Sequence, residues 1–188
     1  MRTFLAVFPS SPAQQAAERV VERLRRRGDD VAWVRRENLH YTLRFLGELD
    51  EDAVARVIAA ARAVATGLPA FEAVLGAPGA FPSAARARVL WLGLARGAES
   101  LVALAAALDR ALAERGFAAA ERPFSPHLTL GRVRRREQDW SARLDAIGTA
   151  LEPEWAPTFA VDRIVVVQST LSPGGSIYRV CAEAALAA

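Results

Sequence analysis

The chain contains two histidines in 188 residues, and both occupy the same short motif. His40 opens the sequence His-Tyr-Thr-Leu and His127 opens His-Leu-Thr-Leu, so a threonine follows each histidine by two positions. Imidazole has an ordinary pKa of about 6.5, which lets one histidine accept a proton near neutral pH while another donates one. Threonine hydroxyls can hydrogen-bond the non-bridging oxygens of a phosphate. The repeated motif therefore indicates acid–base chemistry on a phosphodiester.

Other uses of the two histidines fit the sequence less well. A lone histidine in a strand is most often structural, but the repetition of the motif favours catalysis. Two histidines could also bind zinc, yet the chain has no third histidine and no HExxH spacing, and its single cysteine, Cys181, is distant in sequence. A serine hydrolase would need a nucleophile motif such as GxSxG, which is absent. We therefore predict no metal site and no cofactor.

Apolar and polar residues alternate around both histidines, which predicts β-strands. Side chains of a strand point alternately to its two faces. Strict alternation places three side chains of the first motif on one face: His40, Thr42 and Arg44. It places three on the opposite face: Tyr41, Leu43 and Phe45. In the second motif His127 and Thr129 share a face, while Leu128 and Leu130 face the core. Each motif thus offers an imidazole and a hydroxyl about 7 Å apart along its strand.

Periodicity and turn residues divide the whole chain into strands and helices. Strands are predicted at 2–8, 31–49 (with a break at 35–38), 71–81 (as strand and loop), 87–94, 126–133, 159–171 and 176–186. Helices are predicted at 13–27, 51–65, 99–116 and 138–151. The sequence Ser-Pro-Gly-Gly at 172–175 predicts a turn. Both halves follow the order strand, helix, His-x-Thr strand, helix, strand, which we interpret as an internal duplication.

This order of elements predicts an α+β fold. Strands followed by helices suggest two mainly antiparallel sheets with the helices packed outside. A length of 188 residues fits a single domain, residues 1–188, made of two lobes. If the two lobes pack around a pseudo-two-fold axis, both His-Thr pairs line one central cleft.

The composition excludes several classes of protein. Hydrophobic residues make up 52% and charged residues 24%, which is typical of a chain with a packed core rather than a disordered one. Charged residues interrupt every apolar stretch, and the N-terminal apolar run is too short for a signal peptide, so we expect no membrane segment and no export. One cysteine fits a reducing compartment, which predicts a cytoplasmic protein. The net charge of +3 is modest and does not by itself identify a polyanionic partner.

The two histidine motifs resemble a known family. HYTLRFLG and PHLTLGR are similar to the two signature motifs of the two-histidine phosphoesterases, in particular the RNA 2′,3′-cyclic phosphodiesterase (2′-5′ RNA ligase) family. RTFLAVFP, GAFPSAARARVLWLGL and QSTLSPGGSIYRV resemble its opening, central and closing segments, so the resemblance covers nearly the whole chain. It implies a bilobal α+β fold with a cleft between two antiparallel sheets.

The resemblance also implies roles for five residues. His40 would be the proton donor and His127 the proton acceptor. Thr42 and Thr129 would hold the phosphate, and Arg132 would add a positive charge beside it. Strict alternation from His127 puts Arg132 on the opposite face of its strand, so this role requires a twist or bulge near Gly131.

Weaker candidates surround these five. Arg44 shares a face with His40 by alternation, although a solvated charge at the end of a strand is an equally good interpretation. Three phenylalanines could stack an unpaired base or belong to the core: Phe8, Phe45 and Phe81. Ser169 matches a polar position of the family's closing segment. The arginine runs Arg25–Arg27 and Arg134–Arg136 could steer RNA if they border the cleft.

The expected function is metal-independent hydrolysis of the terminal 2′,3′-cyclic phosphate of RNA to a 2′-phosphate. By reversal, the same residues could join such an end to a 5′-hydroxyl in a 2′-5′ linkage. The partners would be RNA ends or nucleotides that bear a cyclic phosphate, and we expect a monomer. The alternative is a non-catalytic module that binds RNA ends without turnover, which the two intact motifs disfavour.

Overall fold

The computed structural model describes residues 2–172 and 175–188, and short strands and helices alternate along them. The strands are β1 Arg2–Val7, β2 Val31–Trp33, β3 Tyr41–Glu48, β4 Phe71–Phe81, β5 Val89–Arg96, β6 Leu128–Val133, β7 Thr158–Val161, β8 Arg163–Ser172 and β9 Gly175–Ala185. The helices are α1 Ser11–Leu24, α2 Glu51–Ala65, α3 Ala98–Ala113 and α4 Ser141–Asp145, with 3-10 turns η1 Arg36–Asn38, η2 Ala84–Arg86 and η3 Pro153–Trp155. Within the described ranges, no helix has the length and apolar composition that a membrane crossing requires.

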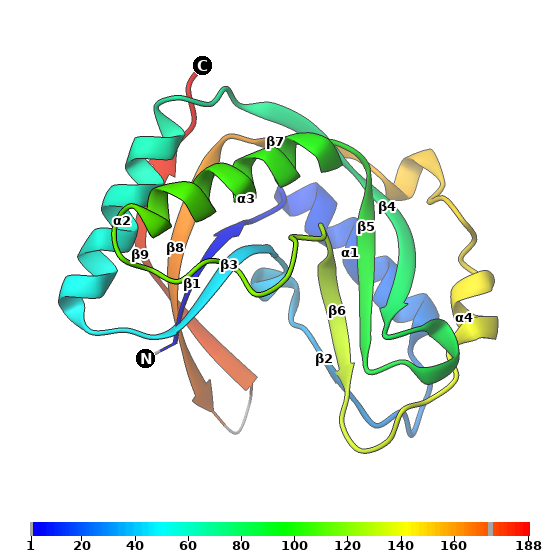
Figure 1. Cartoon of the computed structure of the whole chain (residues 1–188). Helices are drawn as coiled ribbons and strands as arrows, with labels where there is room; N and C mark the ends of the chain where they lie inside the picture. The colour runs from blue at the N-terminus through cyan, green and yellow to red at the C-terminus, as the bar shows by residue number, and fades with distance from the viewer. Residues whose placement is uncertain (1, 173–174) are drawn as a thin grey trace.

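The strands form two antiparallel halves that meet along a very short seam. Their order is β7-β4-β5-β6-β3-β1-β8-β9, and β2 also pairs with β6. At the centre, β3 and β6 are joined by one residue pair, Tyr41 opposite Leu128. In Figure 1 the half with β1, β3, β8 and β9 therefore diverges from the half with β2, β4, β5 and β6 below this seam. The predicted antiparallel pairing is confirmed, but the seam joins the two halves into one continuous sheet rather than two separate ones.

The helices lie on the outer side of the sheets, as predicted, and two of them, α2 and α3, cover the same half of the sheet. Helices α2 and α3 pack on each other and against β3, β8 and β9. Helix α1 contacts η1 and η3 instead and lies beyond β4, β5 and β6 in Figure 1. Because α3 follows β5 in sequence yet covers β3, the two halves cannot separate without unpacking the core.

Most predicted elements are confirmed, and the differences have local causes. The helix predicted at 138–151 is wrong, since only Ser141–Asp145 is helical. Gln138 instead pairs its backbone with Ala87, and Gly148 has φ 97°, a left-handed conformation that ends a helix. The strand predicted at 159–171 is two strands, β7 and β8. The turn predicted at 172–175 contains residues 173 and 174, which lie outside the described residues.

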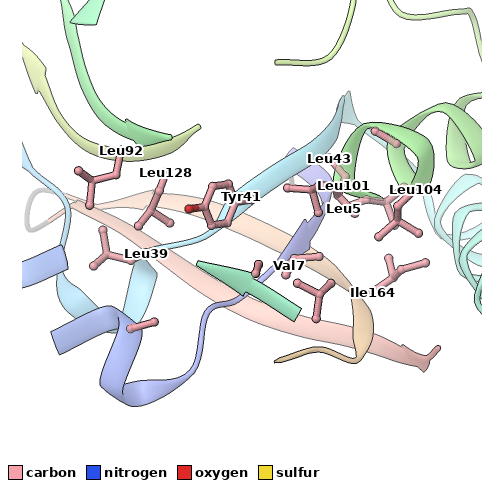
Figure 2. Close-up of a cluster of buried hydrophobic side chains, with 14 of the residues drawn as sticks. Leu5, Val7, Leu39, Tyr41, Leu43, Leu92, Leu101, Leu104, Leu128 and Ile164 are labelled. Atoms are coloured by element: carbon pink, nitrogen blue, oxygen red, sulfur yellow. The ribbon is translucent and has the colours of Figure 1, made fainter. Parts of the chain in front are cut away.

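The core fixes the seam between the two halves. Tyr41 and Leu128 are buried, and the Tyr41 hydroxyl donates a hydrogen bond to the carbonyl of Gly93 at 3.2 Å. Figure 2 shows Tyr41 among buried residues of both halves: Leu5, Val7, Leu39, Leu43, Leu92, Leu101, Leu104, Leu128 and Ile164. Since His40 and His127 directly precede this buried pair, the core sets the position of both histidines.

Candidate active site

The seam brings the two histidine motifs together. Tyr41 and Leu128 are opposite each other in antiparallel strands, and a histidine stands immediately before each. Both Tyr41 and Leu128 point into the core, so the backbone turns the preceding histidines toward the opposite face. The predicted convergence of the two motifs, which are far apart in sequence, therefore follows from a single buried pair.

Both histidine rings are held in the same way. Nδ1 of His40 lies 2.7 Å from the carbonyl oxygen of Asn38, and Nδ1 of His127 lies 2.7 Å from the carbonyl oxygen of Ser125. A carbonyl can only accept, so Nδ1 carries the proton and donates it in each ring. This fixes the tautomer and leaves each Nε2 as the atom that can exchange a proton with a substrate. In the neutral ring of His40, Nε2 accepts a hydrogen bond from the Thr42 hydroxyl at 2.9 Å.

The ring of His40 is enclosed by aromatic side chains. Phe4 stacks on it at 4.9 Å between ring centroids, Phe8 lies at 5.5 Å, and Tyr178 approaches edge-on at 5.4 Å. This burial lowers the pKa of His40 below its ordinary value of 6.5, against the opposing effect of the Asn38 hydrogen bond. Electrostatic repulsion of the protonated ring by Arg132 and, to a smaller extent, by His127 lowers the pKa of His40 further. His40 is therefore neutral at pH 7 when the site is empty.

The surroundings of His127 are more open. One aromatic ring, that of Phe81, meets the imidazole edge-on at 5.2 Å. Its Nδ1 bonds the Ser125 carbonyl, and no hydrogen bond to its Nε2 occurs within the described residues. The Nε2 atom of His127 is thus available to a proton on a nucleophile, whereas that of His40 already faces Thr42.

Two adjoining cavities surround the motifs. The His40 cavity, of about 400 Å³, brings together His40, Thr42, Thr129 and Arg132; its wall also includes Phe4, Phe45, Ser169, Leu171 and Tyr178. The His127 cavity, of about 550 Å³, is lined by His127, Arg44 and the segment 118–125, among others. Thr42 and Phe45 line both cavities. A phosphate placed beside Thr42 would therefore lie where the two cavities meet.

A β-bulge brings Arg132 into the His40 cavity. In the β5–β6 ladder, Leu90 pairs with Gly131 but Trp91 pairs with Thr129, so Leu130 is an extra residue. One extra residue exchanges the two faces of the strand beyond it, and Arg132 consequently points to the same side as Thr129. The bulge that the role of Arg132 requires is present one residue before Gly131. Within the described residues, no carboxylate pairs with the Arg132 guanidinium, which stays available to an anion.

A second bulge overturns the expected orientation of Arg44 and Phe45. Leu5 pairs with Arg44 but Ala6 pairs with Thr42, so Leu43 is an extra residue at this point of β3. The Arg44 guanidinium accordingly turns toward α3, where it donates to the carbonyl of Ala118 at 2.6 Å and lies 3.5 Å from a carboxylate oxygen of Asp109. The prediction that Arg44 shares the face of His40 is wrong. Phe45, which strict alternation put on the face opposite His40, is 56% exposed and lines the His40 cavity.

A comparison with known protein families agrees with this geometry. The model of the 2′-5′ RNA ligase superfamily matches residues 9–172. The chain belongs to this superfamily. Among curated members, the RNA 2′,3′-cyclic phosphodiesterase of Thermotoga maritima is 34% identical over 97% of this chain and 94% of its own length. The protein of the same name from Methanothermobacter thermautotrophicus is also 34% identical, over 95% of each chain.

Solved structures of the superfamily share the fold. The TT0787 protein of Thermus thermophilus superposes with a TM-score of 0.81 at 26% identity, covering 99% of this chain and 98% of its own. Escherichia coli LigT complexed with 3′-AMP superposes with a TM-score of 0.79 at 25% identity, covering 98% and 97%. The predicted fold class and family are therefore confirmed.

The structure places the weaker candidates of this superfamily member in different surroundings. Phe8 and Phe81 contact the histidine rings and are half-buried, whereas Phe45 is 56% exposed. Ser169 lines the His40 cavity. Residues of the two arginine runs line neither cavity; Arg25 lies over the Trp33 ring at 5.5 Å, and Arg135 pairs with Asp30 at 3.5 Å.

Sequence reasoning missed the aromatic enclosure of His40. Phe4 and Tyr178 reach the imidazole from β1 and β9, which belong to the same half of the sheet but lie far apart in sequence. A usable signal was available only for Phe4, which shares strand parity with Phe8 in the opening segment. Tyr178 sits opposite Ser169 in the β8–β9 hairpin, so its approach depends on the hairpin register.

Proposed function

We propose that this protein hydrolyses the terminal 2′,3′-cyclic phosphate of RNA and leaves a 2′-phosphate. The observation that carries this proposal is the pair of imidazoles with the same Nδ1–carbonyl anchor on either side of a seam that also presents Thr42, Thr129 and Arg132. Its curated relatives are named RNA 2′,3′-cyclic phosphodiesterases, and E. coli LigT has been crystallised with 3′-AMP, a nucleoside monophosphate.

The proposed reaction is an in-line displacement at phosphorus. His127 accepts a proton from water through Nε2, the water oxygen bonds to phosphorus, and the bond from phosphorus to the 3′ oxygen breaks. His40 gives that oxygen a proton, while the 2′ oxygen keeps the phosphate. The hydroxyls of Thr42 and Thr129 and the guanidinium of Arg132 stabilise the charge on the non-bridging oxygens.

This assignment requires His40 to gain a proton when the substrate enters. The lowered pKa of His40 keeps the ring neutral in the empty site, where Arg132 and His127 oppose its protonation. A bound phosphate carries negative charge into the same space and raises the pKa of His40 again. The bound phosphate thus promotes protonation of His40, the acid that cleavage of the phosphate ester requires.

We further propose that catalysis needs no metal ion and that the protein acts as a cytoplasmic monomer. Among residues 2–172 and 175–188, no group of three or more histidine, cysteine, aspartate or glutamate side chains is arranged to hold a metal. Both histidines and the phosphate-binding candidates come from one chain, so the site needs no second copy. The identical Nδ1 contacts of the two motifs favour the view that the lobes arose by duplication.

Turnover of a nucleoside 2′,3′-cyclic phosphate in the presence of a chelator tests the proposal. We expect hydrolysis, a single product that co-elutes with the 2′-phosphate standard, and no change on adding EDTA. A 3′-phosphate product would reverse the orientation of the ribose between the two histidines. Binding without turnover would instead support a non-catalytic RNA-end-binding module, and activity restored only by zinc or manganese would support a metal site.

A further inference from the structure

Two arginines on different walls of the His40 cavity have no protein partner. Arg132 reaches this cavity from β6 and Arg2 reaches it from β1, and the two strands belong to different halves of the sheet (Figure 1). Among the residues that the structure describes, neither guanidinium forms an ion pair or a hydrogen bond. A cyclic phosphate carries one negative charge, and Arg132 is placed to meet it. Arg2 is therefore available to a second anion.

Arg2 lies next to the aromatic ring that stacks on His40. Phe4 contacts the imidazole at 4.9 Å between ring centroids, and Arg2 precedes Phe4 by two residues on β1. The extra residues of the β1–β3 ladder belong to β3, so β1 alternates regularly and both side chains share a face. Two residues of a strand span about 7 Å. One nucleotide of an extended RNA strand covers a similar distance, so a strand that runs along β1 from His40 brings its next phosphate to Arg2.

Ser169 adds a hydroxyl to this cation. Arg2 stands directly opposite Ser169 in the β1–β8 ladder, and both side chains line the His40 cavity. Side chains in this relation have Cβ atoms about 4.5–5.5 Å apart, so a guanidinium and a hydroxyl can contact the same phosphate. Across β3, Arg2 stands opposite Glu48, but no ion pair joins these two described residues. The two residues on β1 and β8 are called the Arg2–Ser169 pair below.

We propose that the Arg2–Ser169 pair binds the phosphodiester that joins the terminal nucleotide of an RNA to the nucleotide before it. This inference rests on the proposed binding of the cyclic phosphate with its 3′ oxygen at His40, since that orientation places the terminal ribose in the His40 cavity. The pair contacts no reacting atom. It makes an RNA strand a better substrate than a single nucleotide, and it thereby sets the substrate class of the site.

Stacking of a second base is the competing source of such a preference. Phe45 is 56% exposed and Leu171 is 64% exposed, and both line the His40 cavity. Contacts between a base and an apolar side chain do not depend on the charge of the linkage, whereas a contact with a guanidinium does. The charge of the linkage and the charge of the protein must therefore be changed separately.

Steady-state kinetics on four substrates provides the test. The first is a nucleoside 2′,3′-cyclic phosphate, and the second is the same compound with a 5′-monophosphate. The third is a dinucleotide that ends in the same cyclic phosphate and has a 3′-5′ phosphodiester, and in the fourth a neutral methylphosphonate replaces that phosphodiester. Arg2→Gln removes the cation. Arg179→Gln is the matched control, because Arg179 is exposed in the same half of the sheet but follows Tyr178 on β9 and so points away from the cavity.

We expect the wild-type KM for the phosphodiester dinucleotide to be about three- to tenfold lower than for the methylphosphonate dinucleotide, the range of an exposed charge contact. The value of kcat should be the same, because a contact remote from the reacting atoms stabilises substrate and transition state equally. Arg2→Gln should remove this difference and leave the unphosphorylated cyclic mononucleotide within about twofold of wild type. Its dependence of log kcat/KM on log salt concentration should be shallower by about 0.7, as expected for one phosphate contact of a single strand. Arg179→Gln should match wild type.

Equal wild-type KM values for the charged and the neutral linkage would overturn the inference, and this comparison needs no variant. An equal loss in the Arg2 and Arg179 variants would overturn it too, as would a loss on the cyclic mononucleotide as large as that on the dinucleotide. A gain from the 5′-monophosphate without a gain from the phosphodiester would show that the second anion belongs to a single nucleotide and not to a strand. A wild-type protein that hydrolyses none of the four cyclic phosphates would instead overturn the proposed function.

Discussion

The segments that carry His40 and His127 share a motif, but the arginines that follow the two motifs point in different directions. In both, Nδ1 donates to a carbonyl two residues earlier and the next residue lies in the buried seam. Beyond the threonine, each strand has a β-bulge, at Leu43 in β3 and at Leu130 in β6. The first bulge turns Arg44 away from the His40 cavity, whereas the second turns Arg132 into it. Bulge position therefore decides which arginine can meet the phosphate.

The two imidazoles also differ in their surroundings. Three aromatic rings enclose His40, and this burial lowers its pKa, while a single ring touches His127. Two copies of one motif thus become chemically unequal through residues outside the motif. An acid and a base need such inequality, because they must hold their protons at different stages of the reaction.

Removal of either histidine should have the largest effect. We expect His40→Ala and His127→Ala each to lower kcat/KM at least about 10²-fold, since each removes a positioned acid or base. The double variant should be little worse than either single one, because the two groups act as a unit. Steady-state kinetics on a nucleoside 2′,3′-cyclic phosphate measures this. Near-full activity in folded His40→Ala protein would disprove the two-histidine mechanism.

Melting temperatures of the same variants sharpen the comparison. His40→Ala leaves a gap among Phe4, Phe8 and Tyr178, whereas His127→Ala empties a more open position. We expect the His40 variant to melt lower than the His127 variant. Equal melting temperatures would mean that the aromatic rings contribute nothing to holding His40.

Replacement of Arg132 should affect activity, whereas replacement of Arg44 should affect stability. Arg132→Ala should lower kcat/KM about 10- to 100-fold, the worth of one charge-assisted hydrogen bond to phosphate, and leave the melting temperature unchanged. Arg44→Ala should reduce the free energy of unfolding by about 1–3 kcal/mol, because it leaves the Ala118 carbonyl and Asp109 without their partner. Parallel kinetics and denaturant unfolding check both. The reverse pattern would show that the Leu43 and Leu130 bulges do not set the roles of these residues.

The histidines and threonines were predictable from the sequence because their geometry is local. Alternation over three residues places His40 beside Thr42 and His127 beside Thr129, before either bulge begins. Arg44 and Phe45 follow the bulge at Leu43, and alternation fails for both. For Arg132, the need for a bulge followed from a resemblance to known proteins rather than from any local pattern in β6. A bulge arises from pairing with a neighbouring strand, which a single strand's sequence does not specify.

The limits of the fold prediction have a similar origin. The sequence correctly predicted the strands and the long helices with clear periodicity, including α2 and α3. The helix expected at 138–151 failed because Gln138 pairs with Ala87, a contact between residues that are distant in sequence. The packing of α3 on β3 and the approach of Tyr178 to His40 are also long-range. Local sequence patterns thus predicted the helices and strands but not the long-range contacts between them.

Gly131 offers a way to disturb the β6 bulge without touching a charged group. A Cβ atom at this position would lie 2.8 Å from Cγ1 of Val31 and 2.9 Å from Cε3 of Trp33, closer than side chains allow. Gly131→Ala should therefore push β2 away from β6 and reduce the free energy of unfolding by about 1–3 kcal/mol. Activity should fall with it, because the adjacent Arg132 loses its position. Gly67→Ala is the control, since its Cβ would meet only one atom, at 3.8 Å. Equal unfolding free energies for the two variants would contradict this account of the bulge.

The smallest expected effect concerns the pKa of His40. Burial lowers that pKa below 6.5, so as the pH falls below about 6.5 the unfolded chain takes up a proton that the folded protein does not. Folding stability should therefore be fully present above pH 6.5 and decline on acidification until the pH passes the lowered folded pKa. His40→Gln should remove this part of the pH dependence, while Phe4→Leu, which loosens the enclosure, should bring the pKa of His40 closer to 6.5.

Imidazole proton resonances report the pKa of His40 directly, because the chain has only two histidines and the His127→Ala variant leaves one. Addition of a 2′-nucleotide should then raise the His40 midpoint, since phosphate brings negative charge beside the ring. A midpoint at or above 6.5 in the ligand-free protein would show that the aromatic rings do not make the two histidines unequal.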